Sequence, residues 1–298
     1  MLMTMWQNLW TETGAIPLDE LRSRLETPES RYIELQGMQV HYRDVGASDK
    51  PVLILLHGIF SSLHTWNEWT HLLKDDYRVI SIDMPNFGLT GAHPQGMFKH
   101  IFSDFLNDFT DALNIERCYM AGNSLGGWMT WEFAARFPHK VEKLVLIDSA
   151  GFFFVPPPGL IALGLPLAGW LASHFVLPRS VMYASIRSTY ANPARLDRET
   201  LNRYYELMLR PGNRAAGASV LRFIRNRAGF DNRMMSDIRQ PVLVMWGKDD
   251  AWIPPAHVDR FKHRLPQAEV IRYDDCGHLP MEEWPQKTAD DCRRFLQG

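Results

Sequence analysis

The chain has few cysteines, no excess of either charge and no repeated or compositionally biased tract. Its three cysteines, Cys118, Cys276 and Cys292, form no Cys-x-x-Cys pair and no cluster with histidine at zinc spacing, so we expect free thiols in a reducing compartment. The formal net charge of −2 provides no strong field that would favour nucleic acid as a partner. With 46% apolar and 22% charged residues, the composition is that of an ordinary soluble globular protein.

The N-terminus also lacks the features of a secretion signal. Residues 1–10 include several apolar side chains, but no basic stretch precedes them and the apolar run is interrupted. A cytoplasmic location is therefore the expectation.

Short apolar runs alternate with helical stretches, and this alternation predicts a mostly parallel α/β sheet covered on both faces. The runs are residues 52–56, 78–82, 118–121, 141–147, 241–246 and the weaker 269–273. Helices are expected between them, for example over residues 100–113 and 125–137. Ahead of them, residues 31–35 and 38–44 predict a β-hairpin with Gln36-Gly37 at its turn.

The alternation is interrupted once, in a block of about ninety residues that is too long for an ordinary loop. The block contains no convincing strand, whereas helices are expected over residues 199–209 and 216–225. We interpret residues 152–235 as an inserted helical cap. The core domain would then comprise residues 31–151 and 236–298, after an N-terminal extension over 1–30.

Gly-Asn-Ser-Leu-Gly at residues 122–126 matches Gly-x-Ser-x-Gly between a predicted strand and a predicted helix. Glycines permit a sharp turn that exposes Ser124, and the N–H groups of the helix start can face an oxyanion. In this context we interpret Ser124 as a nucleophile. The N–H of Leu125 and, after the strand at 52–56, the N–H of Ile59 are the expected oxyanion donors. His57 is interpreted as a structural residue and not as a second base.

A serine hydroxyl needs a base at neutral pH, and that base needs a carboxylate partner. His278 follows the last predicted strand, where a loop can reach back over the edge of the sheet. Asp250 follows the strand at 241–246 and is our choice for the acid. Asp249 is its close rival, and Asp148 is a third candidate.

Five segments stand in one order along the chain: His57-Gly58 and residues 83–88, 122–127, 247–250 and 275–278. Together they resemble the α/β-hydrolase fold family, in its branch of microbial lipases and carboxylesterases. The resemblance covers residues 31–157 and 236–298. It implies a mostly parallel central sheet flanked by helices, an inserted cap and a Ser-His-Asp triad. In this family the acid is usually the fourth residue of the Gly-x-x-Asp turn, which is Asp250 here.

Three departures from related families bear on the reaction. Epoxide hydrolases and haloalkane dehalogenases carry an aspartate where this chain has Ser124, which argues against both activities. Carbon–carbon hydrolases of aromatic degradation typically have a glycine-rich oxyanion loop and a tryptophan after the histidine. Here residues 59–62 read Ile-Phe-Ser-Ser, and Leu279 follows His278. Carbon–carbon or other acyl hydrolysis stays as an alternative, and a non-catalytic binder is disfavoured because the triad candidates are intact.

The cap bears on the substrate and on possible partners. Residues 159–176 are nearly all apolar, and we interpret them as a buried cap helix that lines an acyl pocket; a lid that contacts lipid is the alternative reading. Phe60, Trp128 and Phe152 are near the catalytic elements in sequence and suggest an apolar pocket. The sequence thus predicts hydrolysis of a small-molecule ester with an apolar acyl or alcohol group, with neither a metal nor an organic cofactor.

Overall fold

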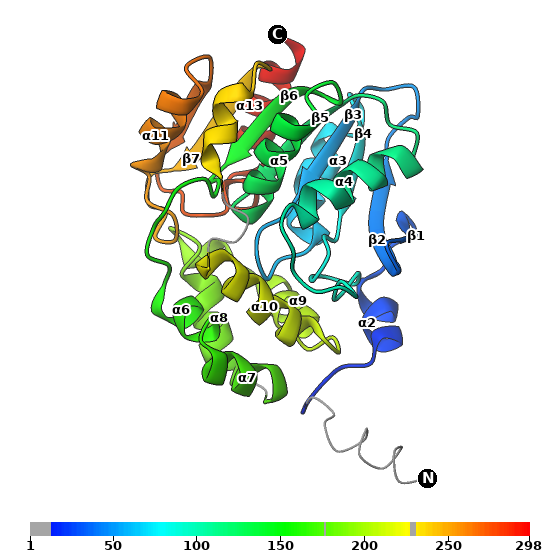
Figure 1. Ribbon diagram of the computed structural model, residues 1–298, viewed down its shortest axis with the longest axis vertical. Helices are drawn as coiled ribbons and strands as arrows, with labels where there is room; N and C mark the ends of the chain where they lie inside the picture. Colours follow the sequence, from blue (N-terminus) through cyan, green and yellow to red (C-terminus); the bar gives the residue numbers. More distant parts are fainter. Residues whose placement is uncertain (1–12, 176, 227–230) are drawn as a thin grey trace.

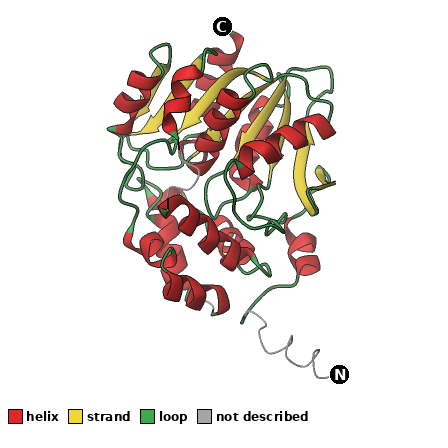
Figure 2. Cartoon of the chain, viewed as in Figure 1, coloured by secondary structure: helices red, strands yellow, loops and turns green. Residues whose placement is uncertain are grey.

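The computed structural model describes residues 13–175, 177–226 and 231–298, which form a sheet with helices on both faces and a group of helices at one end (Figures 1 and 2). The stretch 1–10, considered above for a secretion signal, lies outside the described residues. The mostly parallel sheet flanked by helices that was expected from the sequence is confirmed. Within the described ranges, every helix is too short or too polar to traverse a bilayer.

The eight strands have the order β1-β2-β4-β3-β5-β6-β7-β8. Their bounds are β1 Ser30–Leu35, β2 Met38–Val45, β3 Val52–Leu56, β4 Arg78–Ile82, β5 Cys118–Asn123, β6 Val141–Ile147, β7 Val242–Gly247 and β8 Glu269–Tyr273. β1 and β2 form the predicted hairpin, and β2 also pairs antiparallel with β4. All other pairs are parallel, so the carboxyl ends of β3 to β8 meet at one edge of the sheet.

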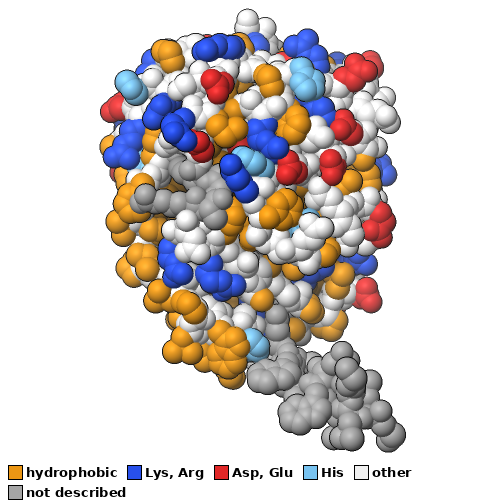
Figure 3. All heavy atoms as spheres, in the orientation of Figure 1, with side chains coloured by type: hydrophobic (Ala, Val, Ile, Leu, Met, Phe, Trp, Pro, Cys, Tyr) orange, Lys and Arg blue, Asp and Glu red, His pale blue; other side chains and the backbone are white. Residues whose placement is uncertain are grey.

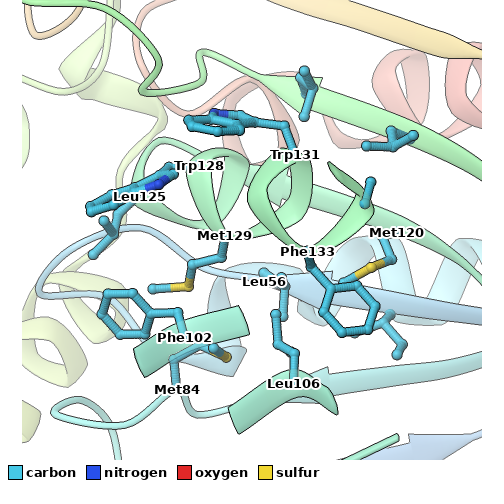
Figure 4. Packing of buried hydrophobic residues seen from close by; sticks show 14 of the residues in the cluster. Leu56, Met84, Phe102, Leu106, Met120, Leu125, Trp128, Met129, Trp131 and Phe133 are labelled. Carbon is cyan, nitrogen blue, oxygen red and sulfur yellow. The ribbon is translucent and has the colours of Figure 1, made fainter. Parts of the chain in front are cut away.

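Both faces of the sheet are buried, and the alternation of side chains along each strand divides the core into two layers. Ile54 and Leu56 of β3 belong to one layer, together with buried residues of α4 (Ile101–Ala112), α5 (Leu125–Arg136) and α11 (His257–Arg264). Leu53 and Leu55 pack on the opposite side, against α3, α12 and α13 (Asn67–Leu73, Pro280–Glu283 and Pro285–Gln297). In Figure 4, Met129 and Phe133 project from α5 toward Phe102 and Leu106 of α4.

Helices α6 to α10 lie between β6 and β7 in the sequence, and we call them the cap. They are α6 Pro158–Leu163, α7 Pro166–His174, α8 Arg179–Arg187, α9 Arg198–Met208 and α10 Asn213–Arg225. Figure 1 shows them together below the sheet, with α2 (Leu18–Leu25) beside them. The helices expected over 199–209 and 216–225 correspond to α9 and α10.

The expectation of one buried helix over residues 159–176 was wrong. The chain forms the two short helices α6 and α7 instead, with Gly164 at the end of the first. Leu165 is extended, with φ −80° and ψ 145°, because the ring of Pro166 disfavours a helical conformation in the residue before it. Pro166 then begins α7, where its missing N–H removes no helical hydrogen bond.

Candidate active site

Ser124 stands at the turn between β5 and α5, with φ 56° and ψ −116°. Positive φ is rare and strained for a residue with a side chain. Two glycines make the turn possible, because a Cβ at Gly122 would lie 2.2 Å from the carbonyl oxygen of Gly126. A Cβ at Gly126 would lie 2.1 Å from the oxygen of Leu56. Close packing around the two glycines thus holds the backbone of Ser124 in its strained conformation. The turn places Ser124 at the carboxyl edge of the sheet.

His278 and Asp250 come together at the same edge. Nδ1 of His278 lies 2.8 Å from Oδ2 of Asp250, and both side chains are buried. The other oxygen of Asp250 accepts hydrogen bonds from the N–H groups of Trp252, at 2.7 Å, and Ile253, at 3.0 Å. These bonds fix the carboxylate relative to the imidazole. Asp249 is exposed to solvent, so of the two neighbouring candidates the fold brings only Asp250 to His278.

A second carboxyl group lies in the same place. One oxygen of Asp148, one of Asp250 and a ring nitrogen of His278 are all within 4.8 Å of one another. Oδ1 of Asp148 accepts the N–H of Gly247 at 3.0 Å. Its Oδ2 receives no hydrogen bond from the described chain, because the neighbouring Asp250 carboxylate is itself an acceptor. Burial, and then the charge of Asp250, raise the pKa of Asp148 well above its usual range.

The loop after β3 approaches the turn at Ser124. His57 is fully buried, its Nδ1 lies 2.7 Å from the carbonyl oxygen of Gly58, and its Nε2 accepts the N–H of Met84 at 3.1 Å. Nδ1 therefore carries the proton, and burial lowers the pKa of the ring. Through these two hydrogen bonds, His57 holds the loop after β3 in place. Across the described chain, the N–H groups of Ile59 and Leu125 donate no hydrogen bond.

Three residues that support the site escaped the sequence analysis. The Asn123 amide donates to the carbonyl oxygen of His278 at 2.9 Å. The buried carboxylate of Glu283 accepts the N–H groups of Gly277, at 2.6 Å, and Ala191, at 3.0 Å. The ring of Trp252 stacks on His278, with centroids 5.7 Å apart. Only Asn123, inside Gly-x-Ser-x-Gly, carried a local signal.

Glu283 links the loop of His278 to the cap, and a backbone hydrogen bond makes a second link. The N–H of His278 donates to the carbonyl oxygen of Thr189, just after α8, at 2.7 Å. Gly277 is required at this contact, since a Cβ there would lie 2.5 Å from the same oxygen. The position of the histidine therefore depends on the cap as well as on the sheet.

Ser124 and His278 both line a cavity of about 450 Å³ between the carboxyl edge of the sheet and the cap. Its walls are mainly apolar side chains of the cap, including Leu163, Leu171, Phe175, Ile186 and Met208. No Lys, Arg, Asp or Glu is among the described residues that line it. Within the described chain, no hydrogen bond joins the Ser124 hydroxyl to His278, and catalytic contacts of this kind often tighten only when substrate binds.

The three aromatic residues expected in the pocket have different positions. Phe60 lines the cavity. Trp128 does not, because α5 directs it into the core, where it stacks on Phe223 with ring centroids 6.5 Å apart. Phe152 also lies outside the described lining. Its ring packs edge-on against that of Phe261 of α11, with the ring centroids 5.0 Å apart.

Comparison with known proteins shows the family to which this sequence is similar. Residues 51–285 match the α/β hydrolase fold family. One relative is the 2-hydroxy-6-oxo-2,4-heptadienoate hydrolase of Pseudomonas putida, which is 29% identical over 262 residues, or 83% of this chain and 89% of that protein. Another is the pimeloyl-[acyl-carrier protein] methyl ester esterase of Aromatoleum aromaticum. It is 31% identical over 254 residues, or 81% of this chain and 96% of that protein.

Solved structures of other proteins have the same fold. A bacterial membrane phospholipase A superposes with a TM-score of 0.77 at 25% identity, over 90% of this chain and 86% of that one. Relatives with the same fold therefore include a hydrolase of a dienoate, an esterase and a phospholipase.

Proposed function

Because the chain belongs to the α/β-hydrolase fold family, we propose that it is a serine hydrolase that cleaves carboxylic esters. Ser124 is the nucleophile, His278 the base and Asp250 the acid. The observation that carries the proposal is the strained Ser124 in one cavity with His278, whose Nδ1 is held by Asp250. That cavity accepts the apolar acyl or alcohol part of the ester.

The reaction proceeds in two halves. His278 removes the proton of the Ser124 hydroxyl as its oxygen attacks the ester carbonyl, and Asp250 stabilises the imidazolium. The N–H groups of Leu125, at the positive end of α5, and of Ile59 stabilise the oxyanion. The alcohol leaves with the proton from His278. Water, deprotonated by His278, then attacks the acyl-enzyme, the carboxylic acid leaves, and His278 returns the proton to the Ser124 oxygen.

The lining of the cavity supports a neutral substrate. A dienoate of the kind named for the Pseudomonas putida relative carries a carboxylate, which requires a cationic or strong hydrogen-bonding partner when buried. The described lining offers no lysine or arginine for that role. Carbon–carbon hydrolysis stays the second candidate function because that relative matches 83% of the chain.

A panel of substrates tests the proposal. We expect release of p-nitrophenol from acyl esters, covalent labelling of Ser124 by a fluorophosphonate, and little turnover of 2-hydroxy-6-oxo-dienoates. Ser124→Ala should lose on the order of 10⁴-fold or more in kcat while keeping its fold. Preferred turnover of the dienoates would support the carbon–carbon reaction. Ester turnover within tenfold of wild type in a folded Ser124→Ala protein would refute the nucleophile.

A further inference from the structure

The outer surface of the cap exposes an unusual concentration of large apolar side chains. Nine of the ten large apolar side chains that are exposed in the described chain fall within residues 153–181. We use the name cap apolar face for six of them on α6, α7 and the flanks of α8: Ile161, Leu167, Trp170, Leu171, Phe175 and Val181. Leu167 is 71% exposed and Phe175 is 53% exposed. Contiguous apolar patches on a folded protein mark surfaces that bind something.

The charges around this face have one sign. Residues 149–196 contain no Asp or Glu, and of their three arginines Arg179 and Arg187 form no ion pair within the described chain, whereas Arg195 pairs with Asp275 and Glu283. Arg222 of α10 packs against α7, with its guanidinium 3.3 Å from where a Cβ on Gly169 would stand. Figure 3 shows apolar side chains at the cap end of the molecule with Lys and Arg side chains close by. An apolar segment that carries arginines and no acid matches an anionic lipid interface.

The face is continuous with the catalytic cavity. Leu171, Phe175 and Val181 are each more than 40% exposed to solvent, and the same three residues line the cavity that contains Ser124. An apolar chain that leaves a bilayer at this point therefore stays in contact with apolar side chains on its way inward.

We infer that the cap apolar face docks on an anionic lipid bilayer. Apolar side chains of α6, α7 and the start of α8 enter the interface between headgroups and acyl chains, while the neighbouring arginines contact anionic headgroups. This docking goes beyond the proposed ester hydrolysis and does not depend on it, because it can be measured with the Ser124→Ala protein. If the proposed hydrolysis also holds, the bilayer is a direct source of its ester substrates.

Sedimentation with vesicles tests the docking. Ser124→Ala protein is mixed with vesicles of phosphatidylcholine alone or of phosphatidylcholine and phosphatidylglycerol. We expect stronger binding to the anionic vesicles, weakened by added salt. Leu167→Asp and Trp170→Asp should each lower the vesicle-bound ratio at least about tenfold, because a charge replaces an apolar group that enters the interface. Ala47→Asp, with the same new charge on an exposed loop between β2 and β3, should change binding less than about twofold.

Three outcomes would overturn the inference. Equal binding by Leu167→Asp and Ala47→Asp would show that the cap apolar face is not in contact with lipid. Binding that survives both cap substitutions but is lost on removal of residues 1–12 would assign it to the N-terminal segment. A dimer that Leu167→Asp dissociates, in protein that binds no vesicles, would assign the face to a second copy of the chain. Circular dichroism of each variant controls for folding.

Discussion

Asp148 and Asp250 approach one another so closely that one oxygen of each lies within 4.8 Å of the other and of a ring nitrogen of His278. Both aspartates are buried. Two carboxylates in such a place resist being charged together, and burial together with the charge of Asp250 raises the pKa of Asp148, which favours its protonated form. When protonated, Oδ2 of Asp148, which otherwise has no hydrogen-bond partner within the described chain, can donate to Asp250.

Asp250→Asn should lower kcat/KM by ~10²-fold to ~10⁴-fold, because the amide preserves shape but removes the charge that stabilises the imidazolium. The matched control is Asp249→Asn, which removes the same charge from the same turn, but at an exposed position. Its kcat/KM should stay within about threefold of wild type, the range expected for a surface charge. Ester kinetics on both proteins check this. A crippled Asp249→Asn with a normal Asp250→Asn would reverse the assignment.

Asp148→Asn should leave kcat/KM within about threefold of wild type, because a neutral amide replaces a neutral carboxyl and keeps a donor. In the Asp250→Asn background the same change should cost about a further tenfold or more. With the charge at position 250 removed, Asp148 is the carboxyl left near His278 and can ionise beside the imidazolium. Kinetics of the two single variants and the double variant measure this coupling. If the loss of kcat/KM in the double variant equals the product of the losses in the two single variants, Asp148 supplies no charge to His278.

The pH dependence of stability should report the protonated Asp148. Its pKa is raised in the folded state, so its contribution to folding is complete below the unfolded pKa of about 3.9 and is lost as pH rises through the folded value. Asp148→Asn carries no such proton. Its Tm should therefore rise relative to wild type as pH increases from about 4 to 8. Thermal unfolding across that range checks this, and a Tm difference that moves the other way would mean that Asp148 is ionised.

Glu283→Gln should loosen the loop of His278. The buried carboxylate accepts N–H groups from Gly277 and Ala191, and an amide presents one acceptor oxygen and one donor in its place. We expect a loss of about 2 kcal/mol in the free energy of unfolding, and a fall in kcat larger than any change in KM. Glu269→Gln makes the same exchange at an exposed position of β8 and should do neither. Equal effects of the two substitutions would contradict this role.

Ala172→Trp should change the preference for acyl chain length. Ala172 lines the cavity from α7, so a bulky ring there occupies space needed by a longer chain. The ratio of kcat/KM for medium-chain over acetyl p-nitrophenyl esters should fall about tenfold. Ala184→Trp, on the exposed side of α8 and outside the described lining, is the control and should leave the ratio unchanged. An unchanged ratio in Ala172→Trp would place the acyl chain elsewhere.

The sheet and the positions of Ser124 and His278 could be predicted because their signals are local. Buried parallel strands read as short apolar runs, and residues that follow such strands meet at one edge. The choice of Asp250 over Asp249 rested on the spacing of the family's Gly-x-x-Asp turn, because the residues alone do not show how one turn directs two neighbouring side chains. Glu283 was missed for a related reason. Its partners, Gly277 and Ala191, are brought to it only by the complete fold.

Nearness in sequence was a poor guide to the pocket. Trp128 is four residues from Ser124 along the chain. It lies on the side of α5 that faces the core, where its ring packs beside Phe102 and Phe223. The cavity walls come mostly from α6 to α9, whose residues are distant from Ser124 along the chain. In those helices the sequence shows that the side chains are apolar. Which side faces the cavity and which faces outward follows only from how the helices dock.

The contacts of Thr189 and Glu283 with the loop of His278 have a consequence for protein engineering. Exchanging the segment between β6 and β7 among homologues is an obvious route to new selectivity, on the view that specificity and chemistry are separate modules. Here the two are connected by hydrogen bonds. The N–H of His278 donates to the carbonyl oxygen of Thr189, and the carboxylate of Glu283 accepts the N–H groups of both Gly277 and Ala191. A chimera should therefore retain residues 189–191 of this chain and be cut outside them, or the transplant will displace His278 together with the pocket.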